Sequence, residues 1–416
     1  MNSQVYSTDI DKTQATVLGN LCNKKRMLTG MAVAFGNRLN CESQWFGNAQ
    51  EAGCVDGKFI LDIKPVKEDS LFDLASITKL FTSISALQLI EKRLLRMTDT
   101  VGQVDDRFVF LQNLSIFDLL CYKVSLQTDE RLDRQTCPER LMELIFNAKA
   151  YPIQGERVYS DMHALILKFV IERIVQSTFE DYLTQSIFIP LSMFNTFCAV
   201  PESQVGRCVN YNYEHRIIKG KFQVDVDALP GKPHDPKARI IDAMGLGVSG
   251  HAGIFSTVGD MVCFAQGLLQ GKLISEQFLQ LIGLNRTGYS KLSGIYRQYM
   301  GLLCFSKSSV QRLSELPPWM GRRCFGLSGY TGNHMAFDPD LGVFDILLGN
   351  RCHNRVSKIL PLGDEKKYPL NEDGSGLIQW PDGRKVFSSN QYVYLKDRLI
   401  HQPIYEILRE RGWLNK

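Results

Sequence analysis

Apolar residues recur along this chain with two different periods, and the periods alternate in blocks. Residues 28–36, LTGMAVAFG, are followed by the turn-like NRLNCES and then by QWFGNA. Apolar stretches of this length joined by a polar turn predict a β-hairpin. Between residues 76 and 95 apolar residues return every three to four positions, which predicts a long helix. The chain therefore begins with strands and continues with helices.

Helical patterns fill the middle of the chain. They cover residues 116–122, 138–148, 161–176, 179–191 and 257–270. The stretch 201–248 carries four prolines and indicates loops, whereas 334–350, HMAFDPDLGVFDILLGN, predicts two strands joined by the turn DPDLG. Strands, helices and strands in this order predict a discontinuous α/β lobe with a helical lobe inserted at about residues 76–245.

The composition changes from about residue 361. The polar, turn-rich GDEKKYPLNEDGSG leads into KVFSSNQYVYL and a final amphipathic helix, DRLIHQPIYEILRERGWL. We therefore expect a main domain over residues 1–362 and a C-terminal extension over 363–416. The pattern does not indicate what the extension does.

Charge and cysteine content narrow the class of function. The 416 residues carry a formal net charge of only +4, with basic residues scattered among acidic ones, so nucleic-acid binding is not expected. The 11 cysteines form no C-x-x-C pair and no H-E-x-x-H motif occurs, so we expect neither a metal nor another cofactor. Scattered thiols, an N-terminus without a secretory pattern and the absence of a long apolar run predict a cytoplasmic protein without membrane insertion. A small molecule is the expected partner, and the oligomeric state is left open.

Ser76 and Lys79 lie three residues apart at the front of the predicted helix 76–95. Side chains at positions i and i+3 share a helix face, and a serine becomes a good nucleophile when a neighbouring base accepts its proton. Lysine can act as that base where desolvation lowers its pKa, and the apolar surroundings favour this. The alternative is an ordinary helix start in which Lys79 extends to solvent.

Two further segments carry candidate chemistry. In VYSDMHALIL, the Tyr159 hydroxyl could work as a general acid or base, or Tyr159 could be a core residue beside a helix cap. In CFGLSGYTGNHMAFDPD, the glycines allow close backbone approach, and the N–H groups could form half of an oxyanion hole. The alternative for this segment is a plain turn before an edge strand.

The order SITK, then YSD, then a glycine-rich strand motif resembles the penicillin-recognising serine hydrolases. Within them the chain is similar to the branch of class C β-lactamases, D,D-peptidases and β-lactamase-like esterases. The segments HDPKARIIDAMGLGVSGHAGIFSTVGDMVCFAQGLL and GYTGNHMAFDPDLGVFDILLGNR add to the likeness, which covers roughly residues 20–360. It implies an α/β (α+β) fold of the β-lactamase/transpeptidase type: an antiparallel sheet flanked by helices, with an inserted, mostly helical lobe.

The resemblance also implies a role for each matching residue. Ser76 would be the acylated nucleophile and Lys79 its proton acceptor. Tyr159 would relay a proton to the leaving group and from the deacylating water. The backbone N–H groups of Ser76 and Tyr330 would form the oxyanion hole.

The chain departs from the family pattern at two positions. The strand motif reads Leu327-Ser328-Gly329, where the family usually begins with Lys or His. Without that cation an uncharged ester fits better than a substrate carboxylate. Asp161 stands where Asn is frequent, and an anion there would raise the pKa of Lys79.

A Ser-His-Asp arrangement is the rival for the nucleophile, with Ser249 and His251 in GVSGHAG. A nucleophile elbow needs G-x-S-x-G, and here the second glycine comes one place early. We therefore treat His251 as a candidate pocket residue, together with Asp161, Leu327, Ser328 and Gly329.

The function expected from these observations is a serine hydrolase that forms an acyl-enzyme on Ser76 and cleaves a small-molecule ester. Acyl transfer to a small-molecule acceptor is the nearest alternative, since any nucleophile that enters can resolve an acyl-enzyme. D,D-peptidase or β-lactamase activity is a third, and a catalytically idle binding module is a fourth.

Overall fold

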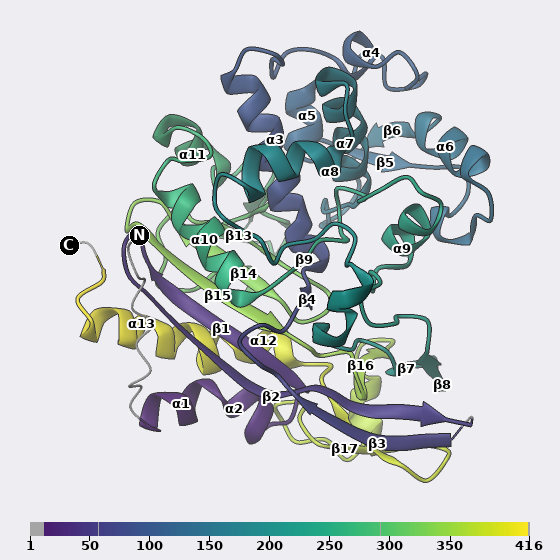
Figure 1. The fold of residues 1–416 in the computed structure, drawn as a ribbon, viewed down its shortest axis with the longest axis vertical. Coiled ribbons are helices and arrows are strands. Elements are labelled where there is room, and N and C mark those ends of the chain that lie inside the picture. Colours follow the sequence, from purple (N-terminus) through teal and green to yellow (C-terminus); the bar gives the residue numbers. More distant parts are fainter. Residues whose placement is uncertain (1–11, 57, 292, 415–416) are drawn as a thin grey trace.

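The structure is a computed structural model that describes residues 12–56, 58–291 and 293–414. Its centre is a seven-stranded antiparallel sheet with the strand order β12-β13-β14-β15-β1-β2-β3 (Figure 1). These strands are β1 Gly30–Asn37, β2 Cys41–Val55, β3 Lys58–Pro65, β12 Phe305–Ser306, β13 Phe325–Ser328, β14 His334–Asp338 and β15 Val343–Gly349. Both predicted hairpins are confirmed. Because β1 pairs with β15, the first and last parts of the sheet meet at its centre, which confirms the expected discontinuous sheet.

Strand β1 shows why the sheet has two covered faces. Its side chains point alternately to opposite sides, as the period of two in a strand requires. Ala32 and Ala34 join the main hydrophobic core, whereas Met31, Val33 and Phe35 join a second core. Both faces of this strand are therefore buried.

The helical region lies at the top of Figure 1. Its longer helices are α3 Thr78–Glu91 and α7 Met162–Val175, with α4 Val101–Val104, α5 Ile116–Leu120, α6 Pro138–Phe146 and α8 Phe179–Leu183 around them. Helix α3 is buried along its whole length from Thr78 to Leu89. A helix that is buried all round serves as a core helix, with apolar residues on all sides. Its buried polar side chains find partners inside the protein: Thr82, Ser83 and Gln88 donate to backbone carbonyls.

Helix α10 (Val258–Leu269) connects the helical region to the sheet. It packs on β1 and β15, and its Phe264 ring lies 4.4 Å from the ring of Phe81 on α3, centroid to centroid. Helix α11 (Glu276–Ile282) follows it. The remaining short elements are α9 Pro236–Ala243 and the paired strands β4 Phe72–Asp73 with β9 Phe255–Ser256, β5 Val124–Gln127 with β6 Lys149–Pro152, and β10 Tyr289–Ser290 with β11 Tyr296–Arg297.

A second sheet stands beside the first, with the order β17-β18-β16-β7-β8. Its strands are β7 Glu214–Ile218, β8 Lys221–Asp225, β16 Arg355–Leu360, β17 Leu377–Gln379 and β18 Lys385–Ser388. The hairpin β7–β8 and helix α9 lie inside the stretch 201–248, so the expectation of loops there is wrong for residues 214–225 and 236–243. The hairpin is held by pairing with β16, more than 100 residues away in sequence.

The predicted C-terminal extension begins at residue 363, and its described part, residues 363–414, packs as part of the main body. Strand β18 pairs with β16, and α12 (Tyr392–Lys396) and α13 (Gln402–Glu410) lie with α1 (Lys12–Leu18) and α2 (Asn20–Asn23) on the sheet face opposite α10 (Figure 1). Ile404 and Leu408 of α13 share the second core with the β1 side chains. The apolar stripe of the last helix therefore covers a sheet face that would otherwise be exposed.

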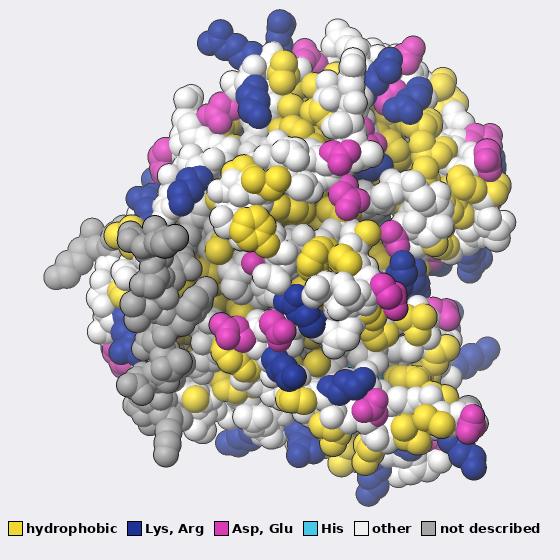
Figure 2. All heavy atoms as spheres, in the orientation of Figure 1, with side chains coloured by type: hydrophobic (Ala, Val, Ile, Leu, Met, Phe, Trp, Pro, Cys, Tyr) yellow, Lys and Arg dark blue, Asp and Glu magenta, His cyan; other side chains and the backbone are white. Residues whose placement is uncertain are grey.

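Acidic and basic side chains are interspersed over the face shown in Figure 2. This distribution agrees with the small net charge of the chain. Within the described residues, every helix is too short or too polar to cross a lipid bilayer.

Candidate active site

Ser76 lies in a sharp turn between strand β4 and helix α3. Residues Ala75–Ile77 form a 3₁₀ turn, so the nucleophile candidate precedes the α-helix rather than lying in its first turn. Ala75 has a φ of 48°, a left-handed conformation that is costly for a residue with a Cβ. The Asp73 carboxylate accepts a hydrogen bond of 2.8 Å from the Ala75 N–H and helps to hold this turn. The Ser76 side chain is half-buried, just before the N-terminus of α3.

Lys79 is fully buried and points at Ser76. Its Nζ donates hydrogen bonds to Ser76 Oγ at 2.9 Å, to Asp161 Oδ1 at 2.9 Å and to the His251 carbonyl at 3.1 Å. The alternative in which Lys79 extends to solvent is therefore wrong. The structure brings together the two residues that the spacing paired.

The pKa of Lys79 follows the expected effect of Asp161 rather than the expected effect of the apolar surroundings. Burial would lower the pKa of the Lys79 ammonium, but the Asp161 carboxylate and the Tyr159 phenol raise it by more, so the pKa lies above its ordinary value. The expectation that apolar surroundings leave this lysine with a lowered pKa is wrong for the resting protein. The pKa of Lys79 is raised because this lysine forms an ion pair with Asp161, the residue that departs from the family pattern.

Tyr159 lies beside Lys79, just before α7. The Lys79 Nζ is 4.7 Å from the centroid of the Tyr159 ring. The ring itself is stacked between those of Tyr122 and Phe305, with centroids 5.9 and 5.8 Å away. Gln298 Oε1 accepts a hydrogen bond of 3.1 Å from the Tyr159 N–H. Tyr159 is thus packed in place within reach of the serine and lysine pair.

Asp161 joins two lysines. Its second oxygen accepts from Lys237 Nζ of α9, so the carboxylate bridges Lys79 and Lys237. Burial would raise the pKa of the Asp161 carboxyl, but Lys79 and the other cationic neighbours hold it well below its ordinary value. Lys237 was missed from the sequence, although it lies in the quoted segment HDPKA. No spacing rule connects it to Asp161, which is 76 residues earlier.

His251 contributes its backbone rather than its ring to Lys79. Its imidazole is buried, and Nε2 lies 3.1 Å from Asp235 Oδ1. Asp235 in turn caps α9 by accepting from the N–H groups of Lys237 and Ala238. This contact orients the loop that supplies the His251 carbonyl.

The strand motif approaches the nucleophile turn very closely at Gly329. A Cβ on Gly329 would lie 2.9 Å from the Leu74 carbonyl oxygen and 3.3 Å from Ala75 Cβ, so only glycine fits here. The next residue, Tyr330, has an N–H without an acceptor among the described residues.

Leu327 does not behave as a pocket residue. Its side chain is fully buried in the main core. Its neighbour Ser328 points the other way, towards the cavity, and contacts Glu315 Oε2 and His334 Nδ1, both at 3.1 Å. The pocket position expected for Leu327 is therefore occupied by Ser328.

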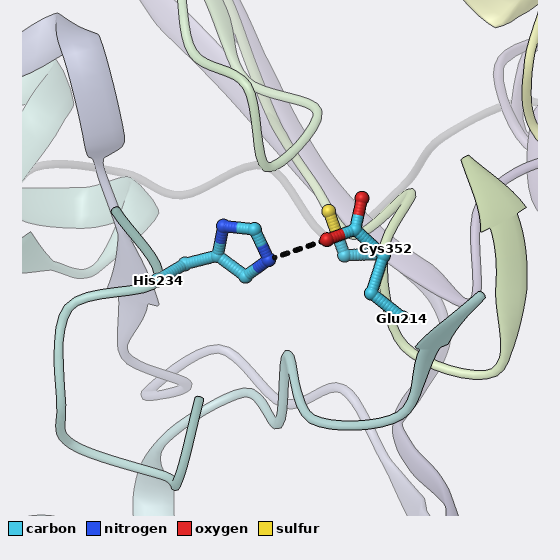
Figure 3. A group of neighbouring side chains, drawn as sticks. All are labelled: Glu214, His234 and Cys352. Carbon is cyan, nitrogen blue, oxygen red and sulfur yellow. Dashed lines mark hydrogen bonds and ion pairs between the residues drawn. The ribbon is translucent and has the colours of Figure 1, made fainter. Parts of the chain in front are cut away.

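The Tyr330 side chain is anchored by a buried network behind the site. Its hydroxyl donates to Glu214 Oε1 at 2.7 Å, and its ring stacks on His234 with centroids 5.5 Å apart. His234 Nε2 lies 3.1 Å from Glu214 Oε2, and the sulfur of Cys352 lies next to the same carboxylate (Figure 3). Burial would raise the pKa of Glu214, but His234 and Arg216 lower it below its ordinary value. No spacing in the sequence predicts this network, because it joins strand β7 to three separate loops.

Two cavities meet at Ser76 and Tyr330. The first, of about 300 Å³, is lined by Ala75, Ser76, Arg216, Ile218, Gln223, His234, Asp235, Pro236, Ala252, Tyr330 and Lys358. The second, of about 510 Å³, is lined by Ser76, Glu156, Arg157, Tyr159, Tyr296, Gln298, Phe305, Leu313, Glu315, Ser328, Gly329, Tyr330, Arg351, Tyr392 and Val393. A buried lysine, a turn-borne serine and two adjoining cavities form an arrangement suited to acyl chemistry.

Comparison with known proteins decides the family. The profile of the family described as Beta-lactamase matches residues 31–360, which is most of the chain. The chain belongs to this family. Its relatives are serine hydrolases of the β-lactamase and penicillin-binding-protein type, as the sequence resemblance indicated.

Individual relatives of this β-lactamase family member are distant. The chain is 25% identical over 343 residues to a protein of Escherichia coli K12 named "Putative D-alanyl-D-alanine carboxypeptidase", covering 76% of this chain and 75% of that one. A protein of the same name from Salmonella gallinarum is 25% identical over 357 residues, covering 77% and 78%.

Solved structures confirm the fold. A class C β-lactamase has a TM-score of 0.60 at 17% identity, covering 84% of this chain and 94% of its own. Simvastatin synthase (LovD) from Aspergillus terreus, in a mutant form, has a TM-score of 0.62 at 15% identity and covers 95% of both chains. The expected β-lactamase/transpeptidase-like fold is therefore confirmed.

Proposed function

We propose that the protein is a serine hydrolase that cleaves a small-molecule ester through an acyl-enzyme on Ser76. The observation that supports this most directly is the position of Ser76 Oγ, 2.9 Å from Lys79 Nζ and at the junction of the two cavities. An acyl group can occupy one cavity while the leaving group departs through the other.

The proton path starts from the resting state of Lys79. As an ammonium, Lys79 donates to Ser76 Oγ and cannot accept a proton. The minor neutral form is the base: it takes the Ser76 proton as Oγ bonds to the ester carbonyl carbon. Tyr159, beside the Lys79 Nζ, then passes a proton to the leaving alkoxide, and the same groups activate water for deacylation. Because the raised pKa of Lys79 makes the neutral form scarce, activity should rise with pH.

The negative charge that develops on the carbonyl oxygen needs hydrogen-bond donors. We assign them to the backbone N–H groups of Ser76 and Tyr330. The Tyr330 N–H has no acceptor among the described residues, and the close approach of Gly329 brings it next to the Ser76 turn. Donors fixed in this way stabilise the tetrahedral intermediate without reorganisation.

We favour an uncharged acyl group because the strand motif lacks the cation that the family usually carries. Leu327, which stands at that position, is buried in the core and offers no charge to a substrate carboxylate. Tyr159, Phe305 and Tyr392 give the second cavity an aromatic part, beside four charged side chains. Of the cations that line the two cavities, Arg216 pairs with Glu214 and Arg351 lies over the ring of Tyr330, whereas Arg157 and Lys358 are the cations that a charged substrate would meet.

Acyl transfer is the second candidate, and the two adjoining cavities favour it. An acceptor could enter one cavity while the acyl group still occupies the other. Simvastatin synthase, which shares the fold, is named for a synthesis rather than for a hydrolysis. Its identity to this chain is too low to transfer that activity, so the choice rests on product analysis.

Labelling tests the proposal. A fluorophosphonate should add one equivalent of mass at Ser76, and an activated ester should give a burst of leaving group. Ser76→Ala should lose both, whereas Ser85→Ala, the same substitution at a buried position of α3, should retain both. Unlabelled wild-type protein, or equal behaviour of wild type and Ser76→Ala, contradicts the proposal.

Product analysis separates the possible reactions. With added alcohols or amines, a hydrolase releases the free acid and a transferase releases a new ester or amide. A peptide ending in D-alanyl-D-alanine and a chromogenic β-lactam test the activities carried in the names of the relatives. A labelled protein without turnover on any of these substrates would indicate a binding module.

A further inference from the structure

A buried cluster of two histidines and one aspartate lies beneath the strand that carries Ser328. His334 comes from β14, Asp345 from β15, and His401 from the turn that leads into α13. All three side chains are completely buried. One potential ligand atom from each lies within 4.8 Å of the other two. The cluster therefore joins the central sheet to the C-terminal segment.

Three polar atoms in this cluster lack a hydrogen-bond partner among the described residues. They are His334 Nε2, Asp345 Oδ1 and His401 Nε2. The other atoms are used: His401 Nδ1 lies 2.5 Å from Asp345 Oδ2, and His334 Nδ1 lies 3.1 Å from Ser328 Oγ. Buried polar atoms are almost always paired, because an unpaired one costs about 1–3 kcal/mol. Three such atoms in one place indicate a ligand with several bonds to offer.

The histidine on the sheet has one ring nitrogen free for a ligand. Its Nδ1 already contacts Ser328 Oγ, and its buried Nε2 has no hydrogen-bond partner among the described residues. The ammonium of the nearby Lys396 donates a hydrogen bond of 3.0 Å to the Glu315 carbonyl, so it points at that carbonyl. Asp397 adds negative charge beside the cluster, with its Oδ1 3.8 Å from His401 Nε2. This oxygen also lacks a hydrogen-bond partner among the described residues, although the side chain as a whole is 34% exposed.

The buried network of Glu214, His234 and Cys352 (Figure 3) gives a useful contrast. It also brings three potential ligands together. Both oxygens of Glu214 accept hydrogen bonds, however, neither residue has an atom among the buried unpaired ones, and the carboxylate already pairs with Arg216. That network is satisfied without an ion, whereas the cluster of His334, Asp345 and His401 is not.

We propose that His334, Asp345 and His401 bind a divalent transition-metal ion of the Zn²⁺ class. Two imidazoles and a carboxylate are typical Zn²⁺ ligands, with bonds of about 2.0–2.2 Å, and water completes the tetrahedron. Ligand atoms in such a site lie about 3.4 Å apart, and one ring nitrogen or carboxylate oxygen from each residue lies within 4.8 Å of the others, so the side chains need to close by about 1.4 Å at most. On binding, the hydrogen bond between His401 Nδ1 and Asp345 Oδ2 is kept or exchanged for a bond to the ion, according to which atoms bind it. The ion has a structural role, because it ties the C-terminal segment to β14 and β15.

The site also reaches the active-site cavity. A metal-bound imidazole usually donates its other N–H to a nearby oxygen, and here that oxygen is Ser328 Oγ. Ser328 lines the second cavity, so the ion would fix the orientation of a cavity residue. No sequence motif reveals the site, because its ligands lie 11 and 56 residues apart in three separate elements.

Metal binding is tested on the full chain, after the exposed thiols Cys54 and Cys137 have been blocked and bound metal removed with a chelator. We expect equilibrium dialysis against Zn²⁺ to give one ion per chain by elemental analysis. At about 100-fold excess over the Kd, Zn²⁺ should raise the Tm by roughly 3–5 °C. His401→Gln should bind no Zn²⁺ and show no Tm rise.

His215→Gln is the matched control. His215 is also buried, with both ring nitrogens unpaired, but it belongs to none of the potential ligand groups, so this variant should bind Zn²⁺ like wild type. If His401→Gln does not fold, Asp345→Asn replaces it with the same expectation. Wild-type protein that binds no Zn²⁺, or a ligand variant that binds as much as His215→Gln, overturns the proposal.

Discussion

Asp161→Asn tests how the protein sets the protonation of Lys79, the proposed base. Among the described residues, Asp161 is the only carboxylate in an ion pair with Lys79, at 2.9 Å, and Lys79 is fully buried. At an effective dielectric constant of about 20, two unit charges at this distance attract by about 6 kcal/mol. Asparagine has nearly the same shape and keeps an oxygen for the Lys79 hydrogen bond, so the substitution removes mainly the charge.

The loss of this charge should favour neutral Lys79. A base with a raised pKa must lose its proton before it can act, so we expect the activity of the wild type to rise with pH into the alkaline range. Even one quarter of the attraction, about 1.4 kcal/mol, would increase the neutral fraction about tenfold. We therefore expect the acid limb of Asp161→Asn to move to lower pH, with kcat/KM at pH 7 increased about tenfold or more.

The assay is the hydrolysis of an activated ester, with kcat/KM measured from pH 5 to pH 10 and the Tm recorded at each pH. Asp235→Asn is the control, because it removes a carboxylate from the same loops that contacts His251 instead of Lys79, and asparagine still caps α9. Its acid limb should move less. An unmoved acid limb in Asp161→Asn, or equal shifts in the two variants, would refute the role assigned to the ion pair.

Four further substitutions address the base, the cavity wall, the strand and the C-terminal helix. Lys79→Ala should slow acylation of Ser76 by a fluorophosphonate about 10²–10⁴-fold; near-normal labelling would remove Lys79 as the base. Tyr330→Phe should cost about 1–3 kcal/mol in urea unfolding, because the hydroxyl bonded to a buried carboxylate is lost, while an unchanged stability would contradict that anchoring role. Leu327→Lys should cost about 3–5 kcal/mol because it places a charge in the core, and a stable variant that binds carboxylate substrates would show instead that this position faces the cavity. Leu408→Ala should lower the stability of the whole protein by about 2–5 kcal/mol in one cooperative transition, whereas a separate minor transition would mean that the C-terminal segment unfolds alone.

The parts of the fold that depend on local pattern were predictable. The β1–β2 hairpin, the β14–β15 hairpin and helix α3 follow from apolar periods that a single segment carries. The β7–β8 hairpin was not, since short strands in a proline-containing stretch are held by pairing with the distant β16. Likewise, the amphipathic pattern of α13 predicts a helix with one apolar face but does not identify the sheet face that it covers.

The candidate site divides in the same way. The spacing of Ser76 and Lys79 brings them into contact because both lie within one turn of chain. For the ion pair between Asp161 and Lys79, the sequence predicted only the direction of the effect: an aspartate raises the pKa of a nearby lysine. Whether Asp161 would point at Lys79, and that Lys237 would share it, depends on three segments folding together.

Leu327 shows why a motif alone can mislead about a strand. Successive side chains in β13 point to opposite faces, so Ser328 and Leu327 cannot both line the same cavity. The structure gives the cavity to Ser328 and the core to Leu327. The position where the family usually carries a cation therefore does not line the cavity in this protein. Its leucine points into the core instead. We therefore expect Ser328 and the other residues lining the cavity to select the substrate. Because the partner of Ser328, His334, belongs to the proposed metal site, loss of that site should also change the choice of substrate.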